Sequence, residues 1–443
     1  MTGTYQLATN DYANGVATDS SGNVYVTGGT KGGLDGNTSA GNTDLFVIKY
    51  NSSGTKQWTK QLGSSVRDSA NGITIDSSGN IYVTGMTFGG LDWNTSAGAN
   101  DLFVIKYNSS GTRQWTKQFG SASTDAANGV ATDSSGNVYV AGVTYGGLDG
   151  NSKGNSDLFV VKYNSSGTKQ WTKQLGTEEY DEARGVAADS SGNVYVVGGT
   201  KGRLNGISNS GRTDVFMIKF NSSGTRQWTK PLGTVQNDLA NGVSIDSSGN
   251  FYVAGVTYQH LDGNTSAGSA DLFVAKYNSS GTKQWTKQLG TSGRDHARGV
   301  ATDSFGNVFV AGDTYGGLDG NTNAGYNDLF VVKYNSSGTK QWTKQLGTSS
   351  TDLASGVTTD SSGNVYVAGG TYGGLDGNTN TGGSDLFVVK YNSSGIKQWT
   401  KQIGSSSHNY DYGRSNILTQ NTYKPIISSE LPQLIPHSQI PSK

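Results

Sequence analysis

Cysteine is absent from the 443 residues, so the chain forms neither disulfide bonds nor thiolate metal sites. The sequence also lacks an apolar run of the roughly 18–20 residues needed to span a bilayer. The first residues contain neither a basic nor an apolar segment of the secretory type, so we expect no signal peptide in this chain. Lys plus Arg and Asp plus Glu balance at 33 each, which argues against a nucleic-acid partner.

Catalytic motifs are missing as well. The chain has four histidines and no P-loop, dinucleotide-binding or nucleophile-elbow motif. Aspartate is plentiful, so a pair of carboxyl groups that cleaves glycosidic bonds stays open as an alternative. An enzyme, however, needs one carboxyl group in a unique environment that shifts its pKa, and near-identical repeats offer many similar ones. We therefore expect no enzymatic activity and no catalytic residue.

A repeat of about 57 residues dominates what is present. The string Gln-Trp-Thr-Lys recurs seven times, with six spacings of which five are 57 residues and one is 56. Its tryptophans are Trp58, Trp115, Trp171, Trp228, Trp285, Trp342 and Trp399. Glycine, 66 of 443 residues, is about twice its usual share of ~7% and is spread periodically. A period of this length, with several short strands per unit, is typical of propeller blades.

The first unit predicts four short antiparallel strands. Residues 14–18 and 24–28 flank a polar hairpin turn, and residues 44–50 and 56–62 flank a second one. The third strand is apolar on both faces, so both of its faces must be covered. A closed ring meets that demand, whereas an open stack needs polar caps that the end units lack. We predict an all-β, seven-bladed β-propeller with four antiparallel strands in each blade.

The flanking segments fall outside this pattern. We predict a propeller over residues 11–404, preceded by residues 1–10 as the remnant of a last strand, which either latches the ring or indicates that the chain is cut from a longer one. Residues 405–443 hold four of the five prolines and lose the strand period, which indicates a disordered or loosely docked tail.

The residues Gly15–Val26, Gly-Val-Ala-Thr-Asp-Ser-Ser-Gly-Asn-Val-Tyr-Val, and their copies resemble the bacterial SBBP-type beta-propeller repeat, which is similar in pattern to NHL and YVTN repeats. The resemblance covers residues 11–404. It implies a seven-bladed propeller of the kind found in secreted or surface bacterial proteins, and it implies no catalytic residues. Extracellular or cell-surface localisation follows from the resemblance alone, and the absence of a signal peptide in this chain runs against it.

Aspartates gather in the loops that we expect on one face of the ring. Their oxygen ligands suit Ca²⁺, so a calcium site is one interpretation, and hydrogen bonding to loop amides is the other and the favoured one. The candidate metal ligands are Asp35, Asn37, Asp44, Asp92, Asp101, Asp319 and Asp328. No other cofactor is expected.

Departures from the repeat mark candidate ligand-binding residues. Trp93 stands in a loop where the other units have glycine, and is a candidate for stacking on a ligand; the seven repeated tryptophans are expected to pack between blades. The fourth unit carries Lys201, Arg203 and Arg212 close to three glutamates, which predicts one charged sector. His260 and His296 flank the boundary of units five and six beside Asp295; a metal site there and neutral drift in surface loops are both open.

The function that best fits these features is a non-catalytic binding or adhesion scaffold. Repeated loops on one face suit multivalent binding to a protein partner or a glycan. The alternatives are a polysaccharide hydrolase or lyase that uses loop aspartates, and a structural spacer. We expect a monomeric ring without a membrane span.

Overall fold

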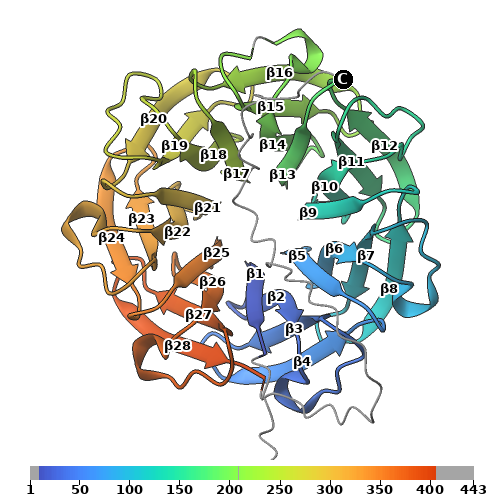
Figure 1. The fold of residues 1–443 in the computed structure, drawn as a ribbon, viewed down its shortest axis with the longest axis horizontal. Helices are drawn as coiled ribbons and strands as arrows, with labels where there is room; N and C mark the ends of the chain where they lie inside the picture. The colour runs from blue at the N-terminus through green and yellow to red at the C-terminus, as the bar shows by residue number, and fades with distance from the viewer. Residues whose placement is uncertain (1–8, 208, 406–443) are drawn as a thin grey trace, which may run out of the picture. The chain divides into compact units, whose positions relative to one another are not determined.

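The structure, a computed structural model, describes residues 9–207 and 209–405. These residues form seven four-stranded antiparallel sheets around a central channel (Figure 1). They contain no α-helix and five single-turn 3₁₀ helices, and none of these helices has the length to cross a membrane. The predicted seven-bladed all-β propeller is confirmed. Most of the predicted latch, residues 1–8, and the tail from residue 406 lie outside the described residues.

Each blade is built from four strands that are consecutive in the sequence. Blades 1 and 2 consist of β1 (Asp11–Thr18), β2 (Val24–Thr30), β3 (Asp44–Tyr50), β4 (Lys56–Leu62), β5 (Asp68–Ile75), β6 (Ile81–Thr87), β7 (Asp101–Tyr107) and β8 (Arg113–Phe119). Blades 3 and 4 consist of β9 (Asp125–Thr132), β10 (Val138–Thr144), β11 (Asp157–Tyr163), β12 (Lys169–Leu175), β13 (Asp181–Ala188), β14 (Val194–Thr200), β15 (Asp214–Phe220) and β16 (Arg226–Leu232). Blades 5 and 6 consist of β17 (Asp238–Ile245), β18 (Phe251–Thr257), β19 (Asp271–Tyr277), β20 (Lys283–Leu289), β21 (Asp295–Thr302), β22 (Val308–Thr314), β23 (Asp328–Tyr334) and β24 (Lys340–Leu346). Blade 7 consists of β25 (Asp352–Thr359), β26 (Val365–Thr371), β27 (Asp385–Tyr391) and β28 (Lys397–Ile403), and the 3₁₀ turns are η1 (Leu34–Gly36), η2 (Leu91–Trp93), η3 (Leu204–Gly206), η4 (Leu318–Gly320) and η5 (Leu375–Gly377).

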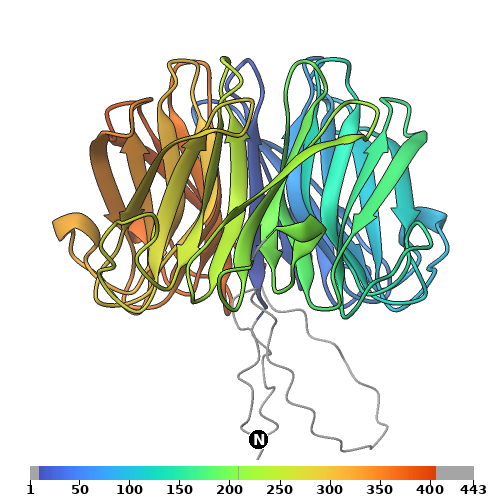
Figure 2. The ribbon, with the colours of Figure 1, turned by 90° about the horizontal axis from the view of Figure 1, so that it is seen from above.

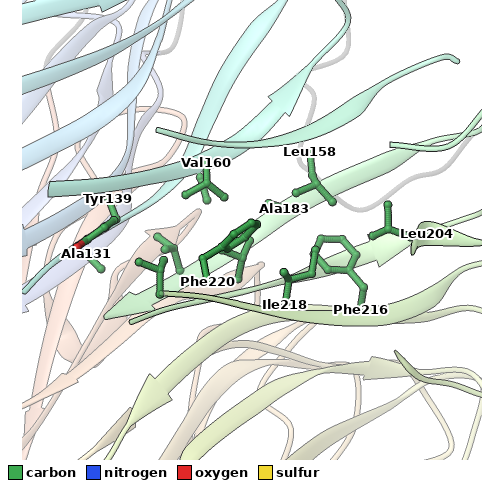
Figure 3. Packing of buried hydrophobic residues seen from close by; sticks show 13 residues of the cluster. Ala131, Tyr139, Leu158, Val160, Ala183, Leu204, Phe216, Ile218 and Phe220 are labelled. Atoms are coloured by element: carbon green, nitrogen blue, oxygen red, sulfur yellow. The ribbon is translucent and has the colours of Figure 1, made fainter. Parts of the chain in front are cut away.

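The hydrophobic core lies between blades rather than inside them. Every third strand is buried on both faces, as the apolar pattern predicted: Leu45 and Val47 pack toward blade 2, while Phe46 and Ile48 pack toward blade 7. Figure 3 shows the cluster between blades 3 and 4, where Leu158 and other side chains of blade 3 meet those of blade 4. Seven such clusters follow one another around the ring, so each blade is stabilised by its two neighbours.

The ring closes with the contacts that join any two blades. One parallel bridge links each pair of neighbours, such as Thr43 to Arg67 between blades 1 and 2, and Asn10 to Ser384 takes this place between blades 7 and 1. The amide of Gly383 donates to the carbonyl oxygen of Thr9 at 2.7 Å. Because β28 pairs with β27 of its own repeat, blade 7 is complete without an exchanged strand.

The seven repeated tryptophans pack between blades, as expected. The ring of Trp58 lies 6.0 Å from that of Tyr25 in its own blade. It also covers Gly111 in the turn of the next blade, where a Cβ atom would come within 3.0 Å of the indole. Gly111 has φ +80°, so this turn requires glycine for its conformation as well as for the close approach. The repeated tryptophan of each blade therefore packs against the turn glycine of the neighbouring blade.

The two faces of the ring differ in what they expose. Asp11, Thr30 and Asp44 are aligned by strand pairing, so the start of β1, the end of β2 and the start of β3 lie at one end of the blade. The long loops and the links between blades therefore share one face, which we call the loop face; it is the lower side of the ring in Figure 2. The short hairpin turns occupy the opposite face.

Candidate functional site

A ring of polar side chains lines the channel. Each innermost strand has a β-bulge after its conserved alanine position in the repeat, between Ala13 and Gly15 in blade 1, and a bulge redirects the side chain of the extra residue. The seven bulge residues are Asn14, Asn71, Asn128, Arg184, Asn241, Arg298 and Ser355. We call this set the bulge ring.

Hydrogen bonds from the bulge ring tie blades together. The Nδ2 atom of Asn14 donates to the carbonyl oxygen of Ala70 in blade 2 at 2.8 Å, and Asn71, Asn128 and Asn241 make the equivalent bond. Just beyond the bulge ring, glycines bring the innermost strands so close that the channel narrows to a cavity of about 160 Å³. That volume is below the ~300 Å³ of ordinary ligand pockets, so a ligand larger than a few atoms must bind at the mouth.

Aromatic residues recur on the loop face, at the end of the second strand of the blade. The residue directly after the second strand is aromatic in five blades and lysine in the other two, Lys31 and Lys201. We call the five the aromatic collar: Phe88, Tyr145, Tyr258, Tyr315 and Tyr372, which are 42%, 48%, 36%, 47% and 41% exposed. This set was missed from the sequence, although its signal was there, an aromatic residue after the same threonine in five of seven repeats.

Electrostatic coupling places collar hydroxyl groups beside the innermost strands. Burial raises the pKa of Tyr145, and the neighbouring Glu182, on the innermost strand of the next blade, adds to this increase. The pKa of Arg298 is raised overall: burial lowers it, Asp313 raises it, and Tyr315 and Tyr258 add smaller increases. Tyr145, Tyr258 and Tyr315 therefore lie near charged side chains of the innermost strands.

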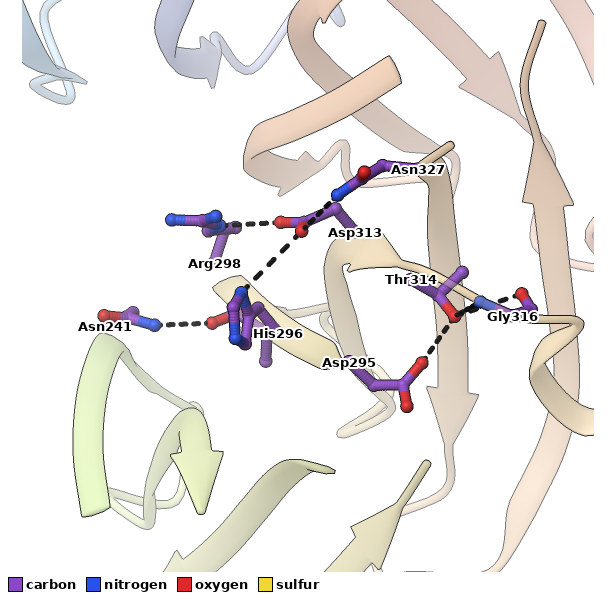
Figure 4. A network of polar contacts seen from close by, with 9 residues as sticks. Asn241, Asp295, His296, Arg298, Asp313, Thr314, Gly316 and Asn327 are labelled. Atoms are coloured by element: carbon purple, nitrogen blue, oxygen red, sulfur yellow. Dashed lines mark hydrogen bonds and ion pairs between the residues drawn. The ribbon is translucent and has the colours of Figure 1, made fainter. Parts of the chain in front are cut away.

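Blade 6 carries a buried ionic network at this site (Figure 4). The Nε atom of Arg298 donates to Asp313 Oδ1 at 2.7 Å, and Asn327 Nδ2 donates to Asp313 Oδ2 at 3.3 Å. His296 Nδ1 lies 3.7 Å from the same oxygen. Burial lowers the pKa of His296, against the opposing effect of Asp313, so the imidazole is neutral at pH 7.

Of the two interpretations of His260, His296 and Asp295, the metal site is not supported, because the structure does not bring the three side chains together. His296 faces Asp313, whereas the carboxylate of Asp295 accepts from Thr291 and Thr314 on the other side of the strand. His260 Nδ1 accepts from the amide of Ser266 within its own loop at 2.8 Å. In the ranges that the structure describes, no three His, Cys, Asp or Glu side chains are grouped so that they could hold a metal. Neighbouring residues of a strand point to opposite faces, which explains why Asp295 and His296 separate.

The charged sector of blades 3 and 4 forms a cleft of about 860 Å³. Glu178, Glu179, Arg203 and Lys153 line it. Of the other predicted residues, Lys201 lies over the ring of Tyr180 at 4.5 Å, and Arg212 is exposed and absent from the cleft lining.

Trp93 is 99% exposed and has φ +67°. The equivalent position is glycine in the other six blades, with φ between +76° and +87°; in blade 1 it is Gly36. A non-glycine residue in this left-handed conformation costs roughly 1–2 kcal/mol. The side chain gains no packing in return, so Trp93 is available for an external contact.

The loop aspartates have structural hydrogen bonds. Asp35 pairs with Lys56 and accepts from Thr59 at 2.7 Å, and Asp44 accepts from the amide of Ala40 and from Gln61, each at 2.8 Å. The amide group of Asn37 donates to the carbonyl of Leu34.

The matching candidates in other blades have the same partners. Asp92 pairs with Arg113 and Asp319 with Lys340, while Asp101 and Asp328 accept from a loop amide and a glutamine. These side chains turn toward different neighbours, and calcium binding stays a prediction.

The family follows from comparison of the repeats. The family model described as beta-propeller repeat, SBBP, matches residues 6–35, 57–92, 114–149, 170–205, 284–319 and 341–376. The chain belongs to the SBBP beta-propeller repeat family. The five matches after the first each run from the last strand of one blade into the next blade. The SBBP propeller has a seventh unit without a match, around residues 227–262, yet blade 5 folds like the others.

Curated relatives of the SBBP propeller are longer proteins. It is 25% identical over 380 residues to Regulatory protein FlaEY of Caulobacter vibrioides, covering 74% of this chain and 39% of the relative. It is 23% identical over 469 residues to an uncharacterized WD repeat-containing protein of Acanthamoeba polyphaga mimivirus, covering 77% of this chain and 34% of the relative. The chain therefore spans well under half of either protein.

Solved structures similar to the SBBP propeller include the beta-propeller domain of the Trilobed protease from Pyrococcus furiosus, with 10% identity and a TM-score of 0.48 over 93% of this chain and all of that one. A gluconolactonase from Xanthomonas campestris has 13% identity and a TM-score of 0.39, covering 69% of this chain and 84% of that one. Similarities with TM-scores this low support no conclusion about function.

Proposed function

We propose that the protein is a non-catalytic binding module that takes a glycan at the channel mouth of its loop face. The observation that carries the proposal is the aromatic collar. Five large side chains at equivalent positions of the loop face stay 36–48% exposed, and exposed apolar surface of this kind marks an interaction site. Aromatic rings combine apolar faces with polar edges, which suits them to the mixed surface of a sugar ring.

The repetition of the collar supports multivalent binding. Five equivalent rings offer several weak contacts to one extended ligand, and linked contacts raise the overall affinity well above that of each. Trp93 adds a further exposed ring on η2 of blade 2. A protein partner is the competing occupant of the same face.

Catalysis by loop aspartates has little support in their environment. Asp35 is paired with a lysine, and the buried Asp44 accepts two hydrogen bonds, so neither is poised in a cleft. The hydrolase alternative would instead use Glu178 and Glu179 in the 860 Å³ cleft. Release of reducing ends from polysaccharides, abolished by either glutamate-to-glutamine substitution, would establish that alternative.

The setting of the module belongs to the same proposal. We place it at a bacterial surface, as the family resemblance implies, and as a monomeric ring without a cofactor. Fractionation of the native bacterium, with detection of the protein in the cytoplasm only, would refute the surface location.

Binding to a broad glycan array, with Ca²⁺ and then with chelator, tests the function. Each collar ring is expected to contribute about 0.5–1.5 kcal/mol, so Tyr315→Ala should weaken binding about two- to tenfold, and adding Tyr258→Ala and Tyr372→Ala should weaken it much further. Tyr326→Ala is the matched control, because Tyr326 is 74% exposed but lies outside the collar. No glycan binding in either condition would refute the proposal and favour a protein partner or a spacer. Loss of binding with chelator would indicate calcium at the loops.

A further inference from the structure

Blade 6 departs from the repeat at two positions that meet near the channel mouth. Asp313 stands where the second strand of the other blades has glycine, valine or methionine, and it is aligned with His296 across the strand pair. Arg298 is the bulge residue of the same blade. Only blade 6 among the seven places a carboxylate at this buried position of the second strand.

The carboxylate of Asp313 holds Arg298 in place. The Asp313 side chain is only 2% exposed, and a buried carboxylate is costly unless it is paired. Arg298 supplies the pairing through Nε at 2.7 Å, and Asn327 satisfies the second oxygen. The hydrogen bond from Nε to Asp313 therefore fixes the orientation of the guanidinium group of Arg298.

The other edge of this guanidinium remains available. In the described part of the chain, the two terminal nitrogens of Arg298 have no hydrogen-bond partner, and the residue lines the channel. The second arginine of the bulge ring differs in this respect. Arg184 Nη1 donates to Asn241 Oδ1 at 3.0 Å, and Nη2 donates to Glu182 at 3.2 Å. Of the two arginines, Arg298 alone therefore presents free terminal nitrogens to a ligand.

The neighbours of Arg298 define the chemistry of that ligand. Two parallel N–H groups of arginine match a carboxylate in a bidentate pair. Arg298 and Asp313 cancel in formal charge, as do the adjacent Arg294 and Asp295, so a carboxylate would be attracted by the open edge of the guanidinium rather than by a net positive charge. Two collar tyrosines, Tyr258 and Tyr315, are near enough to Arg298 to contribute to its raised pKa.

We propose that Arg298 forms a carboxylate subsite at the channel mouth and that the ligand is an acidic glycan containing uronic acid residues. A uronic acid joins a carboxylate to a sugar ring, so one residue reaches Arg298 while its ring contacts Tyr258 or Tyr315. The inference rests on the proposed glycan binding at the collar and names the class of glycan.

Matched probes separate the carboxylate from the sugar. The probes are an oligogalacturonate and its methyl ester, which has the same rings without the charge, measured by calorimetry at low and at high salt. The native protein is expected to bind the acid about tenfold or more tightly than the ester, with a preference that weakens as salt rises.

The chain itself supplies variants that should fold. Arg298→Asn combined with Asp313→Val reproduces the pair Asn241 and Val256 of blade 5, so no buried charge is left unpaired. This variant should bind the acid and the ester equally and the ester as the native protein does. The control combines Arg184→Asn with Glu182→Ser, the pair found in blade 2, and should keep the preference for the acid.

The outcomes distinguish the two proposals. Equal binding of acid and ester by the native protein would refute the carboxylate subsite and leave glycan binding intact. Equal loss of preference in both double variants would show that the preference does not depend on Arg298 in particular and would also refute the subsite. If neither probe binds and the array shows no glycan ligand, both proposals are wrong.

Discussion

Replacing Trp93 by glycine should make the propeller more stable. The side chain is 99% exposed, so its removal gives up no buried surface, and its φ of +67° lies in the left-handed region. Because glycine adopts this conformation without steric cost, the substitution should stabilise the folded state by roughly 1–2 kcal/mol. The greater conformational entropy of glycine in the unfolded chain lowers the free energy of unfolding by roughly 0.5–1 kcal/mol. The expected net gain in the free energy of unfolding is about 0.5–1 kcal/mol.

Urea unfolding followed by far-UV circular dichroism measures this gain. With m of about 3 kcal/mol per M, the midpoint should rise by roughly 0.2–0.3 M at unchanged m. The reverse substitution is the matched control: a Cβ atom at Gly36 would meet nothing within 4 Å, so Gly36→Trp should lower the midpoint by a similar amount. A lower midpoint for Trp93→Gly would refute the reasoning, because it would mean that the indole stabilises the folded ring.

Three further predictions concern the core, the aspartates and folding. Phe46→Ala should lower the free energy of unfolding by about 3–5 kcal/mol because the ring is fully buried, whereas Phe88→Ala in the collar should cost far less; equal losses by urea unfolding would contradict the assignment of Phe88 to the surface. Burial raises the pKa of Asp68 in the folded state above its ordinary 3.8, so the folded state holds this proton more tightly than the unfolded state does. The contribution of Asp68 to the free energy of unfolding is therefore greatest below pH 3.8 and falls as the pH rises through the raised pKa. In Asp68→Asn, the urea midpoint should fall less steeply with rising pH than in the native protein. The same pH dependence in both proteins would contradict the assigned role of Asp68. Near-identical blades favour wrong pairings, so refolding from urea should be slow and in several phases, and one fast exponential would exclude this.

The blade pattern was predictable because it is local. The strands follow from apolar, β-branched and aromatic residues and from turns such as Asp19–Asn23, in which Asp19 accepts hydrogen bonds from the amides of Ser21 and Asn23, although the first strand begins at Asp11 rather than at residue 14. The burial of Phe46 and Leu45 on opposite faces required only the period of a strand and the fact that neighbours cover both faces. Trp93 was recognisable by a similar comparison of equivalent positions.

The binding site was less predictable because its members come from different blades. Glu178, Glu179 and Arg203 were expected in one sector and do line one cleft, but the sequence did not separate them from Arg212. His296 was grouped with Asp295, its neighbour in the chain, although its partner is Asp313 on the adjacent strand. A charged residue inside the apolar segment Val308–Thr314 was the missed signal.

The sequence by itself determined the number of blades, the strands in each and the two-sided burial, since these depend on period, alternation and turn chemistry within about 57 residues. Tertiary structure alone decided which side chains meet at the channel mouth. Closing seven blades into a ring brings together residues that recur a full repeat apart, as in the bond from Arg184 to Asn241. It also decided that Arg298 is held by Asp313 with two nitrogens open, because that contact depends on strand register and on a bulge that turns one side chain into the channel.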